Sequence, residues 1–224
     1  MHGQQALDLR KRIIKTISQK GTIMYLQHMF GLLYHPKSEW DSIKKEDHSL
    51  GHVYLTHLIF LAAIPPFAML VGTTQFGWSV IGKEYYYLSM ATAVPMAIGF
   101  YVALLAGMFF MAYTTYWMEK TFGAEASLER CLLFTTFTST PMFLAGAIGI
   151  IPILWLDVFV IMAAVSYTIY LLYAGVPIFM NIPEERGFIF ATSICTVGMC
   201  ALVGIMASAV IIWGMGLAPQ LTGW

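Results

Sequence analysis

The sequence predicts an all-α, polytopic membrane protein with five transmembrane helices, and three observations lead to this fold class. Hydrophobic residues make up 58% of the 224 residues and charged residues 11%, so the chain lacks the polar surface of a soluble domain. Five apolar runs are each long enough to cross a hydrocarbon core, which takes about 20 helical residues. Of the twelve Lys and Arg residues, all but Lys83 fall on one side of the resulting membrane map.

The five runs cover residues 53–75, 88–118, 131–151, 153–180 and 188–214. Backbone N–H and C=O groups in lipid must pair within their own segment, so runs of this length form helices. The third and fourth runs meet at Pro152, and one helix over 131–180 would be far too long for a bilayer. We therefore expect a tight hairpin at 149–152 and a five-helix transmembrane domain over residues 52–224.

The distribution of Lys and Arg predicts the orientation. Eight precede the first span, two lie between spans two and three, and one lies between spans four and five. These three segments share one face of the membrane, which the positive-inside rule assigns to the cytoplasm. We therefore expect a cytoplasmic N-terminus and an external C-terminus at Trp224.

Residues 1–51 form a cytoplasmic tail that is too short for a core of its own. Over residues 6–17, apolar side chains recur at helical spacing with basic side chains opposite, which predicts an amphipathic helix lying on anionic membrane lipid. Residues 23–34 are apolar but too few to span. We expect this second piece to lie in the interface or to pack beneath the bundle.

The third piece of the tail, residues 35–47, predicts a short helix that begins near Pro36. Trp40 and Ile43 fall on one face of this helix, and Glu39 lies on the charged surface around that face. Because Trp40 and Ile43 are its apolar face, we expect Trp40 to dock under the bundle. Glu39 and Trp40 are therefore the functional candidates of the tail.

The tail and the spans together resemble a known family. The residues that carry the resemblance are Pro36, Trp40, Ile43 and Glu46, the Ala-Ile-Pro passage at 63–65, and the passage at 177–182. Over residues 28–215 the chain resembles the YIP-domain family of Ypt/Rab-interacting membrane proteins, above all its short bacterial members. The resemblance implies a bacterial inner-membrane protein that self-associates, and in eukaryotic members a role in vesicle trafficking with small GTPases. The chain lacks the Asp-Leu-Tyr-Gly-Pro motif of those eukaryotic members.

Titratable side chains crowd the entrance of the first span. His48, His52 and His57 lie there beside Glu46 and Tyr54. Imidazole and carboxylate groups suit Zn, Mn or Ni, so Glu46, His48, His52 and His57 predict a divalent metal site. His57 lies about 140° around a continuous helix from His52, so one ion can hold all three imidazoles only if the helix breaks ahead of the span. The alternative is a set of interfacial polar side chains, with no cofactor.

One histidine and one carboxylate lie inside the predicted spans. His57 is about 7–8 Å inside the inner edge of span one, where it needs a partner such as Tyr54, Glu184 or Glu185. Asp157 is near the outer end of span four, about 15 Å from His57 in depth, so the two would serve separate sites. The alternative for Asp157 is contact with interfacial water.

No enzyme or nucleic-acid-binding pattern is present: the chain has no HExxH, no GxSxG and no P-loop. We expect a non-enzymatic scaffold that organises the membrane or binds a protein partner, as a homo-oligomer in membrane lipid. The alternative is a small transporter or channel, for a divalent metal cation, which the polar residues and the prolines inside the first four spans favour. A polar pore reaching both faces would favour transport, and a solid bundle would favour the scaffold.

Overall fold

The computed structural model describes residues 27–45, 51–212, 214–215 and 221–222. Residues 27–34 are helical. The elements that follow are α2 (Pro36–Lys45), α3 (Gly51–Val71), the π-helix η2 (Gly72–Phe76), β1 (Tyr87–Leu88), α4 (Met90–Glu119), η3 (Lys120–Phe122), α5 (Leu128–Ala145), η4 (Gly146–Ile150), α6 (Leu154–Met180), α7 (Glu184–Ile212) and β2 (Leu221–Thr222).

Five helices of the described chain are long and apolar enough to cross a membrane, which confirms the predicted fold class. They correspond to the five apolar runs, with different ends. The second span continues to Glu119 and into η3, and the third already begins at Leu128. The fifth begins at Glu184, so Glu184 and Glu185 form the first turn of α7 rather than part of the preceding loop. That loop is the short stretch 181–183 that follows α6.

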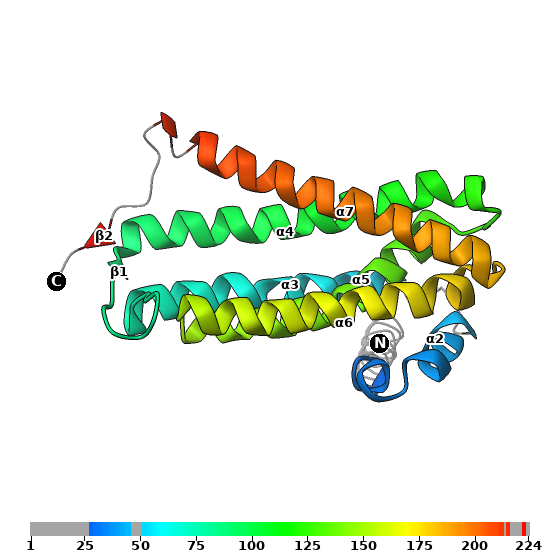
Figure 1. Cartoon of the computed structure of the whole chain (residues 1–224), viewed down its shortest axis with the longest axis horizontal. Coiled ribbons are helices and arrows are strands. Elements are labelled where there is room, and N and C mark those ends of the chain that lie inside the picture. The colour runs from blue at the N-terminus through cyan, green and yellow to red at the C-terminus, as the bar shows by residue number, and fades with distance from the viewer. Residues whose placement is uncertain (1–26, 46–50, 213, 216–220, 223–224) are drawn as a thin grey trace, which may run out of the picture.

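The bundle is built around α5, which packs against α3, α4 and α6, while α7 lies across α6 and α4 (Figure 1). Half of the apolar window of α5 is buried, compared with 11% for α4 and 17% for α7, so α5 is the central helix. Four threonines are buried on α5, and each hydroxyl donates to the carbonyl oxygen four residues earlier. These internal bonds let polar side chains enter the core.

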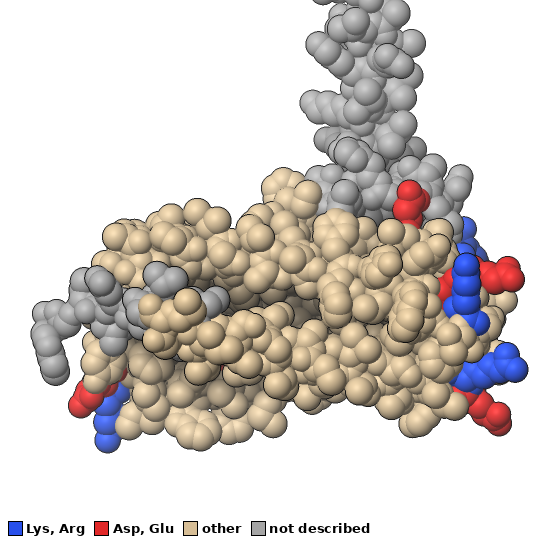
Figure 2. Space-filling model, turned by 90° about the horizontal axis from the view of Figure 1, so that it is seen from above, with Lys and Arg blue, Asp and Glu red and all other residues tan. Residues whose placement is uncertain are grey.

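Helices of alternating direction give the bundle two ends. The α2 end holds α2 and the α4–α5 and α6–α7 connections, and the β1 end holds β1 and the α5–α6 connection (Figure 1). On the face drawn in Figure 2, charged side chains occur at the two ends, with an uncharged belt between them. This arrangement is what a membrane-spanning bundle requires.

The predicted hairpin between the third and fourth spans is confirmed: η4 and residues 151–153 turn the chain from α5 into α6. Close approach to α3 fixes this turn. An added Cβ on Gly146 would lie 2.5 Å from Pro65 Cγ, and one on Gly72 would lie 1.9 Å from the Gly149 carbonyl oxygen. Glycine therefore lets η4 pack directly against the last turns of the first span.

Candidate functional site

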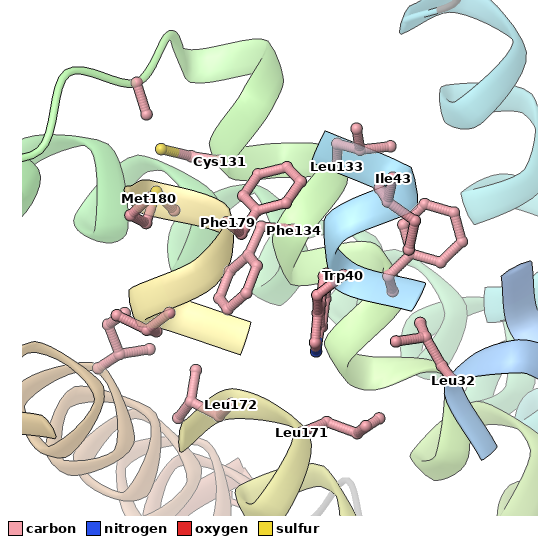
Figure 3. Packing of buried hydrophobic residues seen from close by; sticks show 14 of the residues in the cluster. Leu32, Trp40, Ile43, Cys131, Leu133, Phe134, Leu171, Leu172, Phe179 and Met180 are labelled. Atoms are coloured by element: carbon pink, nitrogen blue, oxygen red, sulfur yellow. The ribbon is translucent and has the colours of Figure 1, made fainter. Parts of the chain in front are cut away.

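The α2 helix is held to the bundle by its apolar face, as its sequence predicted. Trp40 and Ile43 are both 0% exposed. The Trp40 ring centroid lies 4.9 Å from that of Phe134 on α5 and 5.7 Å from that of Phe179 on α6 (Figure 3). Gly175 makes room for the indole, because an added Cβ there would lie 2.6 Å from Trp40 Cε2. The prediction that Trp40 packs against the bundle is confirmed.

The helix at 27–34 packs against the flank of the bundle. His28, Met29 and Leu32 are buried, and the Tyr167 hydroxyl contacts the Leu32 and Leu33 carbonyl oxygens at 2.9 and 3.0 Å. Tyr167 precedes the end of α6 by 13 residues, or about 20 Å along that helix. Residues 27–34 therefore lie beside the middle of α6. Residues 23–26 of this predicted piece lie outside the described chain.

A contact between two side chains joins the helix at 27–34 to α2. The His28 Nδ1 atom contacts the Glu39 carboxylate, and the His28 ring meets Phe137 edge-on at 6.1 Å between centroids. An added Cβ on Gly31 would lie 2.2 Å from the Glu39 carboxylate, so glycine allows the two helices to approach closely. Glu39 therefore acts within the tail, linking its two described helices.

A polar pocket of about 390 Å³ opens beside α2, between the ends of α5 and α6. Lys44 and Arg130 line it together with Glu125, Phe179 and Asn181. Lys44 Nζ donates to Asn181 Oδ1 at 2.9 Å, and Arg130 Nη2 donates to the Phe179 carbonyl oxygen at 3.1 Å. The Arg130 guanidinium also lies 4.9 Å from the centre of the Phe179 ring. Sequence reasoning counted Lys44 and Arg130 for topology and missed that they share a pocket.

A buried carboxylate supports the wall of this pocket. Glu119, at the end of α4, is 2% exposed, and its Oε2 accepts the Ala126 backbone N–H at 2.7 Å. The bond folds the connection 120–127 back over the end of α4 and places Ala126 on the pocket wall. Sequence reasoning missed Glu119 because the residue follows the apolar run directly and reads as a loop charge.

A second, larger cavity of about 740 Å³ lies among α4, α5, α6 and α7. Its walls are apolar apart from a few hydroxyl groups, and no charged side chain lines it among the described residues. In Figure 1, α7 diverges from α6 toward its C-terminal end. The face in Figure 2 shows a hollow within the uncharged belt. One hydroxyl on the wall, Thr168 Oγ1, is buried without a hydrogen-bond partner in the described chain.

The predicted metal site falls largely outside the described part of the chain. Glu46 and His48 lie outside it, and His52 and Tyr54 belong to α3, where their side chains are not described. His57 lies near the start of α3 and is half-buried. Among the described residues, no group of three His, Cys, Asp or Glu side chains is placed to hold an ion. A metal site at Glu46, His48, His52 and His57 stays a prediction.

Asp157 and His57 lie at opposite ends of the bundle, as their predicted depths required. Asp157 is in the first turn of α6, at the β1 end, and is half-buried. Its Oδ1 is buried without a hydrogen-bond partner among the described residues. A carboxylate at this position is favoured by the N-terminal end of the helix dipole. Glu184 and Glu185 are exposed at the other end, in the first turn of α7.

Comparison with known proteins places the chain in a family. Residues 30–205 match the Yip1 domain. The chain is similar to the Inner membrane protein YohC of two Escherichia coli strains, with 37% identity over 191 residues. The match covers 85% of this chain and 98% of each relative. No solved structure matches. Because the Yip1 domain match and the match to the Escherichia coli relatives each cover most of its length, the chain belongs to the Yip1 domain family.

Proposed function

We propose that this protein is a non-enzymatic, membrane-organising protein of the bacterial inner membrane that holds membrane lipid inside its bundle. The observation that carries the proposal is the apolar cavity among α4, α5, α6 and α7. The inner-membrane location rests on the name of the Escherichia coli relatives. The cytoplasmic position of the α2 end rests on the Lys and Arg distribution.

The chemistry of the cavity wall favours an acyl chain as the occupant. The hydroxyls of Thr135 and Thr138 point back to carbonyl oxygens of their own helix, so they offer the cavity little polarity. Water needs two to four polar partners at such a site, so a hydrocarbon chain suits this apolar wall better than water does. The cavity lies within the uncharged belt, where acyl chains surround the bundle.

The packing at the α2 end weighs against transport of a cation. Trp40, Phe134 and Phe179 are 0–1% exposed and contact one another, so they close the bundle below the cavity (Figure 3). Cation pathways through membranes are lined by carboxylates, histidines or carbonyl oxygens. The cavity wall offers hydroxyls in their place. These features favour the membrane-organising function over the transporter or channel.

The lipid occupancy can be tested by filling the cavity from one wall. Gly107 on α4 lines the cavity, and nothing lies within 4 Å of a Cβ added there, so Gly107→Leu places new atoms in open space. Gly99→Leu is the matched control, because Gly99 lies on the same helix, also has no atom within 4 Å of an added Cβ, and does not line the cavity.

Native mass spectrometry of the full-length protein, extracted in a mild detergent, would count the phospholipid molecules retained. We expect Gly107→Leu to lose at least one bound phospholipid relative to wild type, and Gly99→Leu to lose none. Equal retention by the two variants, or a wild-type protein that carries no phospholipid, would overturn the proposal. Flux of Zn²⁺ into proteoliposomes that hold the wild-type protein would instead support the transporter.

Self-association and a protein partner remain proposals that follow from family membership. Cross-linking of the protein in native membranes would test both, since a ladder at multiples of 25.0 kDa reports copies of this chain and other masses report partners.

A further inference from the structure

The geometry points to a second site, a phosphate-binding pocket formed by Lys44 and Arg130 at the α2 end. The pocket would take a phosphate ester carrying negative charge, either the headgroup of an anionic phospholipid or a small free phosphate. This site differs in place and chemistry from the apolar cavity and does not depend on it.

Both cations of the pocket lack an anionic partner among the described residues. Lys44 is bonded to the neutral amide oxygen of Asn181, and Arg130 to a backbone carbonyl oxygen. Within the described residues, neither cation lies within 4.0 Å of a carboxylate oxygen. Of the residues that line the pocket, Lys44 and Arg130 are cations and Glu125 is a carboxylate, while the Glu119 carboxylate behind the wall is already bonded to the Ala126 N–H. An anion entering the pocket would supply the missing partner.

One guanidinium donor of Arg130 has no partner in the described chain. Its Nη2 is engaged with Phe179, but Nε is buried and has no hydrogen-bond partner in the described chain. A buried donor without a partner is costly, and a charged group more so. Stacking over the Phe179 ring holds the guanidinium plane in place. Guanidinium groups suit phosphate oxygens because their donors form a planar fork.

The pocket lies at the end of the bundle that we assign to the membrane surface. Arg130 is in the first turn of α5, and Phe179 and Asn181 mark the end of α6. The ends of spanning helices lie at the level of the lipid headgroups. Arg186 adds a third cation close by, since its Nη1 lies 3.0 Å from the site of an added Cβ on Gly123, another residue of the pocket wall. A phospholipid could therefore bring its phosphate to this pocket from the side.

The test compares adjacent lysines of one helix. Lys44→Gln removes the charge but keeps an N–H donor for Asn181, and Lys45→Gln removes the same charge from a neighbour that does not line the pocket. Arg130→Gln removes the second cation, and Arg130→Lys keeps its charge. Melting temperatures measured without ligand would show that each variant is folded. The probes are dioctanoyl phosphatidylglycerol, dioctanoyl phosphatidylcholine and inorganic phosphate, titrated into full-length protein in a neutral detergent.

We expect wild type to bind phosphatidylglycerol more tightly than phosphatidylcholine, and Lys44→Gln and Arg130→Gln each to weaken that binding about tenfold, or about 1.4 kcal/mol. Lys45→Gln should bind as wild type does. Competition by millimolar inorganic phosphate would identify a free phosphate ester as the ligand, and its absence would identify the lipid headgroup. The proposal is overturned if Lys45→Gln weakens binding as much as Lys44→Gln, or if wild type binds none of the three probes. Gly107→Leu should leave this binding unchanged, which separates it from the cavity.

Discussion

Gly175→Ala tests the docking of α2 with the smallest possible change. An added Cβ would lie 2.6 Å from Trp40 Cε2, 2.7 Å from Trp40 Nε1 and 2.9 Å from Phe134 Cε2, where ordinary contact begins at 3.4 Å. The indole is packed against Phe134 and Phe179, so it cannot yield without moving α2. Overpacking of this kind costs about 1–3 kcal/mol. The same substitution favours a helix by about 1 kcal/mol, since Ala has the higher propensity.

Gly99→Ala separates these two effects, because Gly99 is also inside a spanning helix but has no atom within 4 Å of an added Cβ. The propensity gain cancels between the variants, so Gly175→Ala should be less stable than Gly99→Ala by about 1–3 kcal/mol. Unfolding of the full-length protein in detergent measures the difference. Combining Gly175→Ala with Trp40→Phe should recover part of the loss, with a coupling energy of about 1 kcal/mol or more. Equal stability of the two alanine variants, with no coupling to residue 40, would refute docking at Gly175.

Three further predictions use other parts of the molecule. Glu119→Ala should destabilise the protein by about 1–3 kcal/mol, because the buried Ala126 N–H loses its acceptor; Glu119→Gln keeps an acceptor and should cost less in the same unfolding assay. A reporter fused after Trp224 should be active outside the cytoplasm, because the C-terminus is predicted to be external. A reporter that is active only in the cytoplasm would contradict the predicted orientation. Zn²⁺ binding measured by calorimetry should weaken in His57→Ala and as pH falls through the histidine range, because protons compete for imidazole; a wild-type protein that binds no Zn²⁺ near neutral pH would rule out the site.

Local patterns in the sequence were sufficient to predict the spans and the buried face of α2. Each span is a long apolar run, and hydrophobicity over about 20 residues is a property of neighbours in the chain. Trp40 and Ile43 are three residues apart on one helix, so their shared face follows from helical periodicity. The hairpin at Pro152 was predicted because one helix over residues 131–180 would be too long for a bilayer. Each of these features depends on residues that are neighbours in the chain and not on which helices pack together.

The pocket and the seat for Trp40 could not be predicted, because each joins residues far apart in the chain. Lys44 meets Asn181, and Arg130 meets Phe179, across separations of 137 and 49 residues. Gly175 reads as an ordinary small residue of a span until Trp40 is placed against it. Likewise, nothing near residues 27–34 shows that the Tyr167 hydroxyl will bind their last carbonyl oxygens. Only the three-dimensional packing of α2, α5 and α6 reveals these sites.

Phe134 connects the docked α2 helix with the apolar cavity that we propose to hold lipid. This ring lies against Trp40 on one side and lines the cavity on the other. Close-packed aromatic rings shift together, so loss of Trp40 would free Phe134 and change the cavity floor. If lipid in the cavity favours the docked position of α2, then docked α2 must favour lipid by the same free energy, because coupling between binding sites is reciprocal. Trp40→Ala should therefore reduce the phospholipid retained in native mass spectrometry, although residue 40 does not line the cavity. Unchanged retention in a folded Trp40→Ala protein would show that α2 and the cavity act independently.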